Sequence, residues 1–313
     1  MLGSIGAAAG GNESEQKAMQ LVERMARAAR ELNYDGNFVY SHGSQMDEMR
    51  IIHRNDGSGE QERLISLSGV RREVLRDNMR VTCILPDDQA VVVGKSRPQS
   101  TYGSPVLSAD NGYQKFYRFK LGAPSRVAER PVYFVRIEPR DEYRFGYHLW
   151  TDQGSGLLLR SHLLDESGAV LERILYTRIE LPERIEDSML EPEIEGTEFT
   201  WHTPGEGATA QTDTQSGWTV RWLPPGFTMR DKQIGPMATG RMPVYHTVYG
   251  DGLASFSIYI EEVPGSEQPL EGAARMGAMT AFGRVVDQYQ ITVVGEVPMA
   301  TVTRVGESVA IAE

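Results

Sequence analysis

Six histidines are the residues of this sequence best suited to hold a metal ion or to act as general bases. They are His42, His53, His148, His162, His202 and His246. None belongs to an HExxH motif or to a close pair at the spacing of helical metal ligands. Each is therefore interpreted as a strand or loop residue with a hydrogen-bond partner. The sequence predicts no metal site and no cofactor.

Two further patterns resemble sites of nucleophilic catalysis. Cys83 lies in the apolar run 81–85 with no adjacent His or Arg to stabilise a thiolate, which predicts a buried, inert thiol. Residues 306–308 (Gly-Glu-Ser) imitate a nucleophile elbow, but the chain ends at Glu313, before the helix that must follow such an elbow. We therefore expect no catalytic residues and no enzymatic activity.

The charge balance narrows the classes of partner. The chain has 43 acidic and 32 basic residues and a formal net charge of −11, so its long-range field repels polyanions and argues against nucleic-acid binding. The single cysteine excludes an intrachain disulfide and a thiolate zinc cluster. Every apolar run is shorter than the roughly 18 to 20 residues that a transmembrane helix needs.

The elements that would carry a binding surface are mainly strands. From Ser14 to Leu32, apolar residues recur at three- and four-residue steps, which predicts one amphipathic helix. Short alternating or β-branched runs separated by turn residues follow, and they predict one large, mainly antiparallel sheet. The predicted strands span residues 37–41, 48–54, 62–67, 70–76, 81–85, 90–93, 115–121, 125–127, 132–139, 143–151, 157–164 and 170–179.

A change of composition after Trp201 divides the chain. Residues 203–217 contain no large apolar side chain and are predicted to be a linker, which gives a large domain over 14–202 and a small α+β domain over 218–313. The small domain is expected to have strands at 218–223, 244–249, 254–261 and 290–294 around a helix from Leu270 to Val286. Residues 1–13 are expected to be either a disordered start or the remnant of a signal peptide.

Aromatic residues are frequent in the predicted sheet, and most of them are expected in its core. A strongly curved sheet covered by one layer of helix also leaves a concave apolar face. Such a face suits a lipid chain or an extended peptide. The Gly- and Ser-rich residues 96–114 are predicted to be a long loop that is a candidate lid over this face.

Several motifs then occur in one order along both predicted domains. They include Arg50-Ile51-Ile52-His53-Arg54, Pro139-Arg140-Asp141-Glu142-Tyr143-Arg144-Phe145-Gly146-Tyr147, Trp222-Leu223-Pro224-Pro225-Gly226-Phe227 and Tyr249-Gly250-Asp251-Gly252-Leu253-Ala254-Ser255-Phe256-Ser257. In these motifs the chain resembles the MucB/RseB family of periplasmic negative regulators of an envelope-stress sigma factor. The resemblance extends from about Glu13 onward; a complete signal peptide is absent, and Ala128-Glu129-Arg130 stands where Ala-Gly-Arg is expected.

The resemblance implies a fold and a function. The fold is α+β but mainly β: a large, antiparallel, unclosed β half-barrel with helices, similar to the LolA/LolB lipoprotein carriers, joined to a smaller α/β domain. Such a protein acts in the periplasm, where it binds the periplasmic domain of a MucA/RseA-type anti-sigma factor and shields it from a site-1 protease. Lipopolysaccharide or another acyl-chain ligand is the expected releasing signal, and a second copy of the chain is a further candidate partner.

An alternative from another class is a carrier or chaperone that holds a lipoprotein acyl chain in the same concavity. A hydrolase with a dispersed site is a third hypothesis. Partner-binding candidates in the small domain, chosen as aromatic or arginine anchors, are Trp218, Arg221, Trp222, Arg241, Tyr245, Tyr249, Phe256 and Tyr259. Candidates for a lipid-like ligand in the half-barrel are Phe38, Tyr40, Phe116, Phe119 and Tyr147.

Overall fold

The structure is a computed structural model of the chain. It describes all residues except 1–5, 58, 79, 86–89, 96–111, 194–199, 203–216, 237–242, 264–268 and 313. The predicted linker 203–217, apart from Gly217, lies outside the described residues, and so do residues 96–111 of the predicted loop 96–114. The described end of that loop leads into a turn of 3-10 helix, η1 (Tyr113–Lys115).

The predicted N-terminal helix is present and is longer than expected. Helix α1 spans Gly6–Glu31, so it begins eight residues before Ser14, and the expectation of a disordered start is wrong for residues 6–13. Ala7, Ala8 and Ala9 have the highest helix propensity of any residue type, which favours this extension. The apolar stripe is buried as predicted, with Val22 and Met25 fully enclosed.

The large domain is a single sheet in which every strand predicted between residues 37 and 179 is present. In the described residues the sheet has 13 strands in the order β13-β6-β5-β4-β3-β2-β1-β12-β11-β10-β9-β7, with β8 paired to β9, and its two ends do not meet. All pairings are antiparallel except that of β13 with β6. The strands are β1 (Tyr34–His42), β2 (Gln45–Asn55), β3 (Glu60–Ser66), β4 (Glu73–Asp77), β5 (Arg80–Leu85), β6 (Ala90–Lys95), β7 (Tyr117–Leu121), β8 (Ser125–Val127), β9 (Arg130–Pro139), β10 (Gly146–Asp152), β11 (Leu158–Leu164), β12 (Val170–Glu180) and β13 (Thr200–His202).

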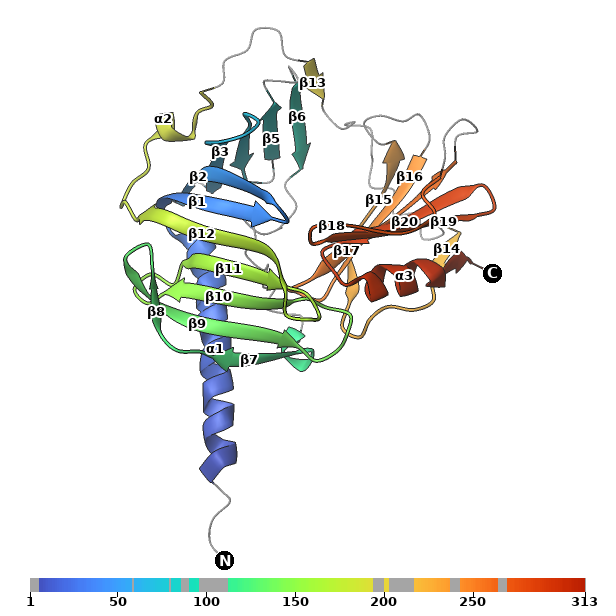
Figure 1. The fold of residues 1–313 in the computed structure, drawn as a ribbon. Coiled ribbons are helices and arrows are strands. Elements are labelled where there is room, and N and C mark those ends of the chain that lie inside the picture. The colour runs from blue at the N-terminus through green and yellow to red at the C-terminus, as the bar shows by residue number, and fades with distance from the viewer. Residues whose placement is uncertain are drawn as a thin grey trace, which may run out of the picture.

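Helix α1 covers one face of this sheet, which we call the inner face. Val135, Ile137 and Leu149 point to this face and are buried in one cluster with Leu21, Val22 and Met25 of α1. Because side chains alternate along a strand, Phe134 and Trp150 point to the opposite, outer face. Figure 1 is viewed from this outer face, with β9–β12 in front of α1. A short helix, α2 (Asp187–Leu190), follows the last long strand.

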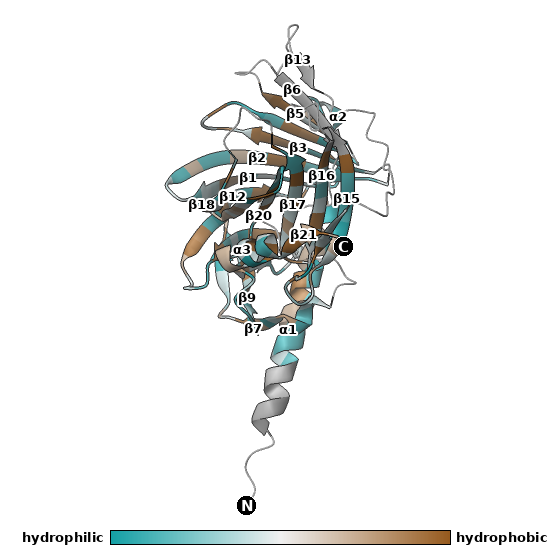
Figure 2. Ribbon diagram, turned by 90° about the vertical axis from the view of Figure 1, so that its right-hand side faces the viewer, coloured by the Kyte–Doolittle hydropathy of each residue, from teal (hydrophilic) through white to brown (hydrophobic). Residues whose placement is uncertain are grey.

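The small domain contains a six-stranded sheet in the order β15-β16-β17-β20-β19-β18, and a separate pair of strands, β14 and β21. Helix α3 (Met299–Ser308) packs on β19 and β20 through Val302 and Val305. The strands are β14 (Trp218–Val220), β15 (Thr228–Pro236), β16 (Pro243–Gly250), β17 (Ser255–Glu262), β18 (Gly272–Met276), β19 (Met279–Val286), β20 (Tyr289–Gly295) and β21 (Val309–Ile311). The side view in Figure 2 shows this domain in front of the large sheet, with hydrophobic residues along strands of both.

One expectation for the small domain is wrong. The predicted helix from Leu270 to Val286 is instead a hairpin of β18 and β19, and the helix of the domain is α3. Gly277, with φ of +62°, makes the turn between the two strands, and residues 280–286 of β19 pair with β20. Pairing within the sheet therefore overrides the helix propensity of the Ala, Met and Arg residues in this segment.

Residues 306–308 lie at the end of α3 and not between a strand and a helix, so they do not form a nucleophile elbow. No helix in the described part of the chain is both long and apolar enough to cross a membrane.

Candidate partner-binding site at the domain junction

A buried ion pair joins the two domains. Arg144, in the segment before β10, places its Nε 2.6 Å from Oδ2 of Asp251, in the turn between β16 and β17, and both side chains are fully enclosed. Tyr117 donates its hydroxyl to the same Oδ2 at 3.0 Å. The other oxygen of Asp251 accepts the backbone N–H groups of Leu253 and Ala254, so the carboxylate is saturated with donors.

Arg144 and Asp251 each stabilise the charged form of the other. Burial alone would lower the pKa of Arg144, but the charge of Asp251 and the hydrogen bond to it outweigh burial and hold that pKa above its ordinary value. Burial, together with the nearby charge of Asp251, raises the pKa of Tyr117 well above its usual range. The arginine therefore stays charged and the phenol stays protonated at any physiological pH.

Aromatic rings enclose the Arg144 guanidinium. Its carbon lies 4.7 Å from the ring centroid of Phe116 in the large domain and 5.0 Å from that of Phe227 in the small domain. Arg144 also donates to the carbonyl of Pro225. Gly226 has φ of +88°, and a Cβ built on it would lie 2.1 Å from the Phe116 ring, so only glycine fits between these rings.

A second contact joins Tyr143 of the large domain to the small domain. Its ring lies edge-on to Trp222 with centroids 5.0 Å apart, and its carbonyl accepts the hydroxyl of Thr301 at 2.9 Å. Arg304 of α3 donates to the Tyr143 hydroxyl, and its guanidinium lies 4.1 Å from the Trp222 ring. Trp222, predicted as a partner-binding anchor, therefore takes part in the domain junction.

The β18–β19 hairpin forms the third contact. Ala278, in its turn, is fully buried in the same cluster as Tyr147 and Leu163 of the large sheet. The guanidinium of Arg275 lies 5.9 Å from the Phe145 ring. Three separate contacts therefore fix the position of the small domain against one end of the large sheet, and a partner would meet both domains as one surface.

Two carboxylates also face each other across this junction. Glu296, which follows β20, is exposed on one side, but desolvation of its carboxylate on the other side raises its pKa to about 7, and repulsion from Glu172 of β12 contributes to this increase. Burial raises the pKa of Glu172 as well. The folded protein therefore holds a proton up to about pH 7 that an unfolded glutamate releases near pH 4.5.

This pair predicts a dependence of stability on pH. The stability that it contributes is fully present below pH 4.5 and is lost as the pH rises through about 7. We predict that Glu296→Gln raises the melting temperature at pH 8 and leaves it nearly unchanged at pH 5. The gain should be below about 1 kcal/mol, because Glu296 keeps contact with solvent. Glu166→Gln, in an exposed turn, serves as the control; an equal change at both pH values for Glu296→Gln would contradict the prediction.

The structure brings four of the predicted partner-binding residues into one cluster. Trp218, Trp222, Tyr245 and Tyr249 are half-buried and pack against the core of the small domain. Tyr249 stacks on Phe256 with centroids 5.5 Å apart. Phe256 is only 2% exposed and belongs to the core itself, because alternation along β17 turns it inward, so it is wrong as a surface anchor.

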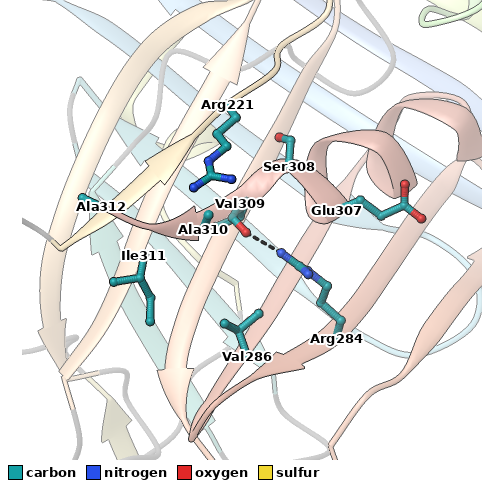
Figure 3. A pocket seen from close by; sticks show the side chains of 9 residues that line it. All are labelled: Arg221, Arg284, Val286, Glu307, Ser308, Val309, Ala310, Ile311 and Ala312. Carbon is teal, nitrogen blue, oxygen red and sulfur yellow. Dashed lines mark hydrogen bonds between the residues drawn. The ribbon is translucent and has the colours of Figure 1, made fainter.

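The other three candidates lie elsewhere. Tyr259 stacks on His246 at 4.2 Å on the opposite face of the small sheet. Arg241 lies outside the described residues. Arg221 is exposed and lines a pocket of about 490 Å³ together with Arg284, Glu307 and residues of β21 (Figure 3). Arg284 is held there by hydrogen bonds from its guanidinium to the carbonyls of Gly306 and Val309.

Most candidates for a lipid-like ligand are already packed. Phe119 and Tyr147 are buried with α1 in one cluster, and Phe38 is buried in the other cluster that α1 joins. These three are therefore wrong as residues lining an open concavity, because α1 fills the face to which they point. Phe116 packs at the domain junction, against Arg144. Tyr40 is half-buried and packs against the second cluster.

The histidines and the cysteine that were candidates for metal binding or catalysis lie at positions where they support the fold. His53 is fully buried with Nδ1 2.8 Å from the carbonyl oxygen of Leu32, and His246 places Nε2 3.0 Å from Oγ of Ser257. Burial raises the pKa of the Cys83 thiol, which disfavours a reactive thiolate. In the described parts of the chain, no three His, Cys, Asp or Glu side chains are arranged to hold a metal ion.

Comparison with known proteins identifies the family. The MucB/RseB N-terminal domain profile matches residues 17–194, and the MucB/RseB C-terminal domain profile matches residues 212–310. The chain belongs to the MucB/RseB family. The resemblance seen in the sequence motifs is thereby confirmed across both domains.

Relatives in this family align over nearly their full length. The sigma factor AlgU regulatory protein MucB of Pseudomonas aeruginosa is 34% identical over 93% of this chain and 90% of its own length. The sigma-E factor regulatory protein RseB of Escherichia coli K12 is 27% identical over 92% of this chain and 89% of its own length. A solved structure of the P. aeruginosa MucA/MucB complex superposes with a TM-score of 0.73 at 30% identity, covering 95% of this chain and 99% of that one.

Proposed function

We propose that this chain binds the periplasmic domain of a membrane-anchored, MucA/RseA-type anti-sigma factor, shields it from site-1 proteolysis and so keeps an envelope-stress sigma factor inactive. One observation carries this proposal. The chain aligns with MucB across both domains, and 95% of it superposes on solved structures of MucB bound to MucA, one of them with the periplasmic segment, with TM-scores of 0.73 and 0.72. The protein would act in the periplasm, where that segment is located.

The proposed mechanism is occlusion without chemistry. The protease can cleave only those partner molecules that are not bound to the regulator, so the cleavage rate falls as the bound fraction rises. The regulator itself needs to make or break no covalent bond. The fixed junction through Arg144, Tyr143 and the β18–β19 hairpin supports such a role, because a rigid pair of domains loses little conformational entropy on binding. Release by a lipid-like envelope ligand remains a prediction from the family resemblance.

We place the partner surface on the small domain and beside the junction. Its proposed anchors are the half-buried or exposed candidates Trp218, Arg221, Trp222, Tyr245, Tyr249 and Tyr259. Aromatic side chains that keep one edge in solvent can gain contact area on binding at a low cost in conformational entropy. Arg221 and Arg284 give the nearby pocket two guanidinium groups against the single carboxylate of Glu307, and this excess of positive charge suits an acidic side chain of the partner.

Calorimetric titration with a purified MucA-type periplasmic segment tests this proposal. Saturable binding is expected for the unmodified chain, and Arg221→Glu should weaken it about tenfold, equivalent to about 1.4 kcal/mol. Arg221 is exposed, so its replacement should leave the melting temperature unchanged. Arg118→Glu, at an exposed position on β7 of the large domain, makes the same change of charge as a control. Absence of binding by the unmodified chain would favour the carrier alternative, and equal affinities for both variants would remove Arg221 from the surface.

A further inference from the structure

A cluster of cations and aromatic rings occupies the outer face of β9–β12, the face opposite to the one on which Tyr147 and Leu163 meet the small domain. Cross-strand pairing places Trp150 between Phe134 and Arg160, and His148 between Arg136 and His162; His162 in turn pairs with Arg173. Residues that pair directly in an antiparallel sheet point to the same face. All seven side chains therefore share the face opposite α1, which is turned toward the viewer in Figure 1.

Arg160 is held in one orientation. The indole of Trp150 is stacked on Phe134, with ring centroids 4.6 Å apart and planes within 8° of each other. The Arg160 guanidinium lies 4.4 Å from the Trp150 ring centroid, and its Nε donates to Nε2 of His162 at 3.1 Å. Stacking and this single hydrogen bond fix the plane of the guanidinium and leave its two terminal nitrogens as unused donors among the described residues. A planar fork oriented in this way is suited to bind an oxyanion with two parallel hydrogen bonds.

The cluster carries positive charge that no carboxylate balances. Arg136, Arg160 and Arg173 make no ion pair with any described residue, although most arginines elsewhere on the large sheet do, such as Arg50 with Asp35 and Arg130 with Asp152. Glu138 lies on the same face and its charge acts on His148, but its carboxylate is 2.5 Å from Lys120 Nζ and so is paired with that cation. Nε of Arg136 is buried and has no hydrogen-bond partner among the residues that the structure describes. Such a concentration of cations is unexpected in a chain with a net charge of −11.

The electrostatics of the neighbouring groups agree with this description. Burial, followed by repulsion from Arg160 and Arg173, lowers the pKa of His162 to about 4. Burial and repulsion from Arg173 also lower the pKa of Arg160. His162 is therefore neutral at pH 7, which allows its Nε2 to accept the hydrogen bond from Arg160. Uncompensated positive potential of this kind is relieved when an anion binds.

We propose that the outer face of β9–β12 is a binding site for a phosphate-bearing group, with Arg160 as the bidentate donor and Arg136 and Arg173 as flanking cations. A phosphate monoester carries a charge of about −1.5 to −2 and three terminal oxygens, so it can accept from more than one arginine at once. A carboxylate has only two oxygens and one charge, and a single bidentate guanidinium engages both oxygens. The site is separate from the proposed partner surface and does not depend on it.

Titration of inorganic phosphate and pyrophosphate into the full chain, followed by NMR of the histidine side chains, tests the proposal. Bound phosphate should raise the pKa of His162, because a nearby dianion favours the imidazolium ion. Arg160→Gln and Arg173→Gln should each weaken binding about tenfold, the loss expected for one charge-assisted hydrogen bond.

Arg173 is exposed and has no hydrogen bond among the described residues, so the Arg173→Gln variant should fold normally. This holds even if Arg160→Gln, which removes the stack on Trp150, prevents folding. Arg178→Gln, on the exposed part of the same strand, is the matched control and should bind like the unmodified chain.

Further arms of the experiment distinguish the sources of the phosphate. Binding to vesicles that contain phosphatidic acid, but not to pure phosphatidylcholine vesicles, would assign the site to a lipid headgroup; binding of the free ions alone would assign it to a soluble phosphate compound. Both results support the proposal. Equal binding by the Arg173→Gln and Arg178→Gln variants would overturn it, as would an unchanged His162 pKa with every probe. Tighter binding of a polyglutamate peptide than of pyrophosphate would also overturn it, in favour of an acidic peptide.

Discussion

Asp251→Asn is expected to lower the free energy of unfolding by about 3 to 5 kcal/mol, the usual cost of leaving one member of a buried ion pair without its counter-charge. Asparagine has nearly the same shape and can still accept the backbone N–H groups of Leu253 and Ala254 through its single carbonyl oxygen. The variant therefore removes the charge beside Arg144 and the acceptor of Tyr117 while it preserves the turn. The large effect should arise from the uncompensated guanidinium.

Urea denaturation of the full chain measures this loss, and limited proteolysis shows where it acts. We expect the variant to be cleaved between its domains at protease concentrations that leave the unmodified chain intact. Arg184→Gln breaks an ion pair with Glu186 in which both side chains are largely exposed, so it should change stability by less than about 0.5 kcal/mol. Equal effects of the two substitutions would show that the junction does not depend on the buried pair.

Gly226→Ala should destabilise the junction by about 2 to 5 kcal/mol, which is the sum of two costs. A side chain at a positive φ costs about 1 to 2 kcal/mol, and forcing a methyl group into a packed site costs about 1 to 3 kcal/mol. At Gly226 both apply, because its φ is +88° and the added Cβ would lie 2.1 Å from the Phe116 ring. The Phe116 ring cannot move aside freely, since it also packs on the guanidinium of Arg144.

Gly168 offers a matched control for this substitution. Its φ is +84°, but no described residue lies within 4 Å of the position of an added Cβ, so Gly168→Ala should incur only the cost of the backbone conformation. Replacing Phe116 by alanine in the Gly226→Ala background should recover the steric part. Thermal unfolding of these variants gives the comparison. If Gly168→Ala and Gly226→Ala were equally destabilising, close packing at the junction would not be the cause.

The strands of the large sheet could be predicted because their side chains alternate and turn residues separate them. The helix α3 could not, since its sequence contains β-branched Thr and Val residues and a glycine. It forms because Val302 and Val305 are buried on β19 and β20 and because Gly306 allows the Phe282 ring to approach closely. For the hairpin at residues 272–286 the opposite holds: its Ala and Met residues favour a helix in isolation, and pairing with β20 makes this segment a pair of strands.

The domain junction could not be predicted from the sequence, for a different reason. Arg144 and Asp251 are 107 residues apart, and only the docking of two domains brings them together. Both lie in motifs that carry the family resemblance, Arg144 in residues 139–147 and Asp251 in residues 249–257. A charged residue inside each motif was the available signal, but nothing in the sequence shows that one charge faces the other.

The proposed occlusion of the partner can be measured as the rate at which a site-1 protease cleaves a membrane-anchored MucA-type anti-sigma factor. We predict that the purified chain slows this cleavage in a saturable manner, at the same concentrations at which it binds the periplasmic segment. The Asp251→Asn variant should protect less well at equal concentration, because its two domains no longer present one fixed surface. A cleavage rate that stays unchanged when the segment is fully bound would contradict the account.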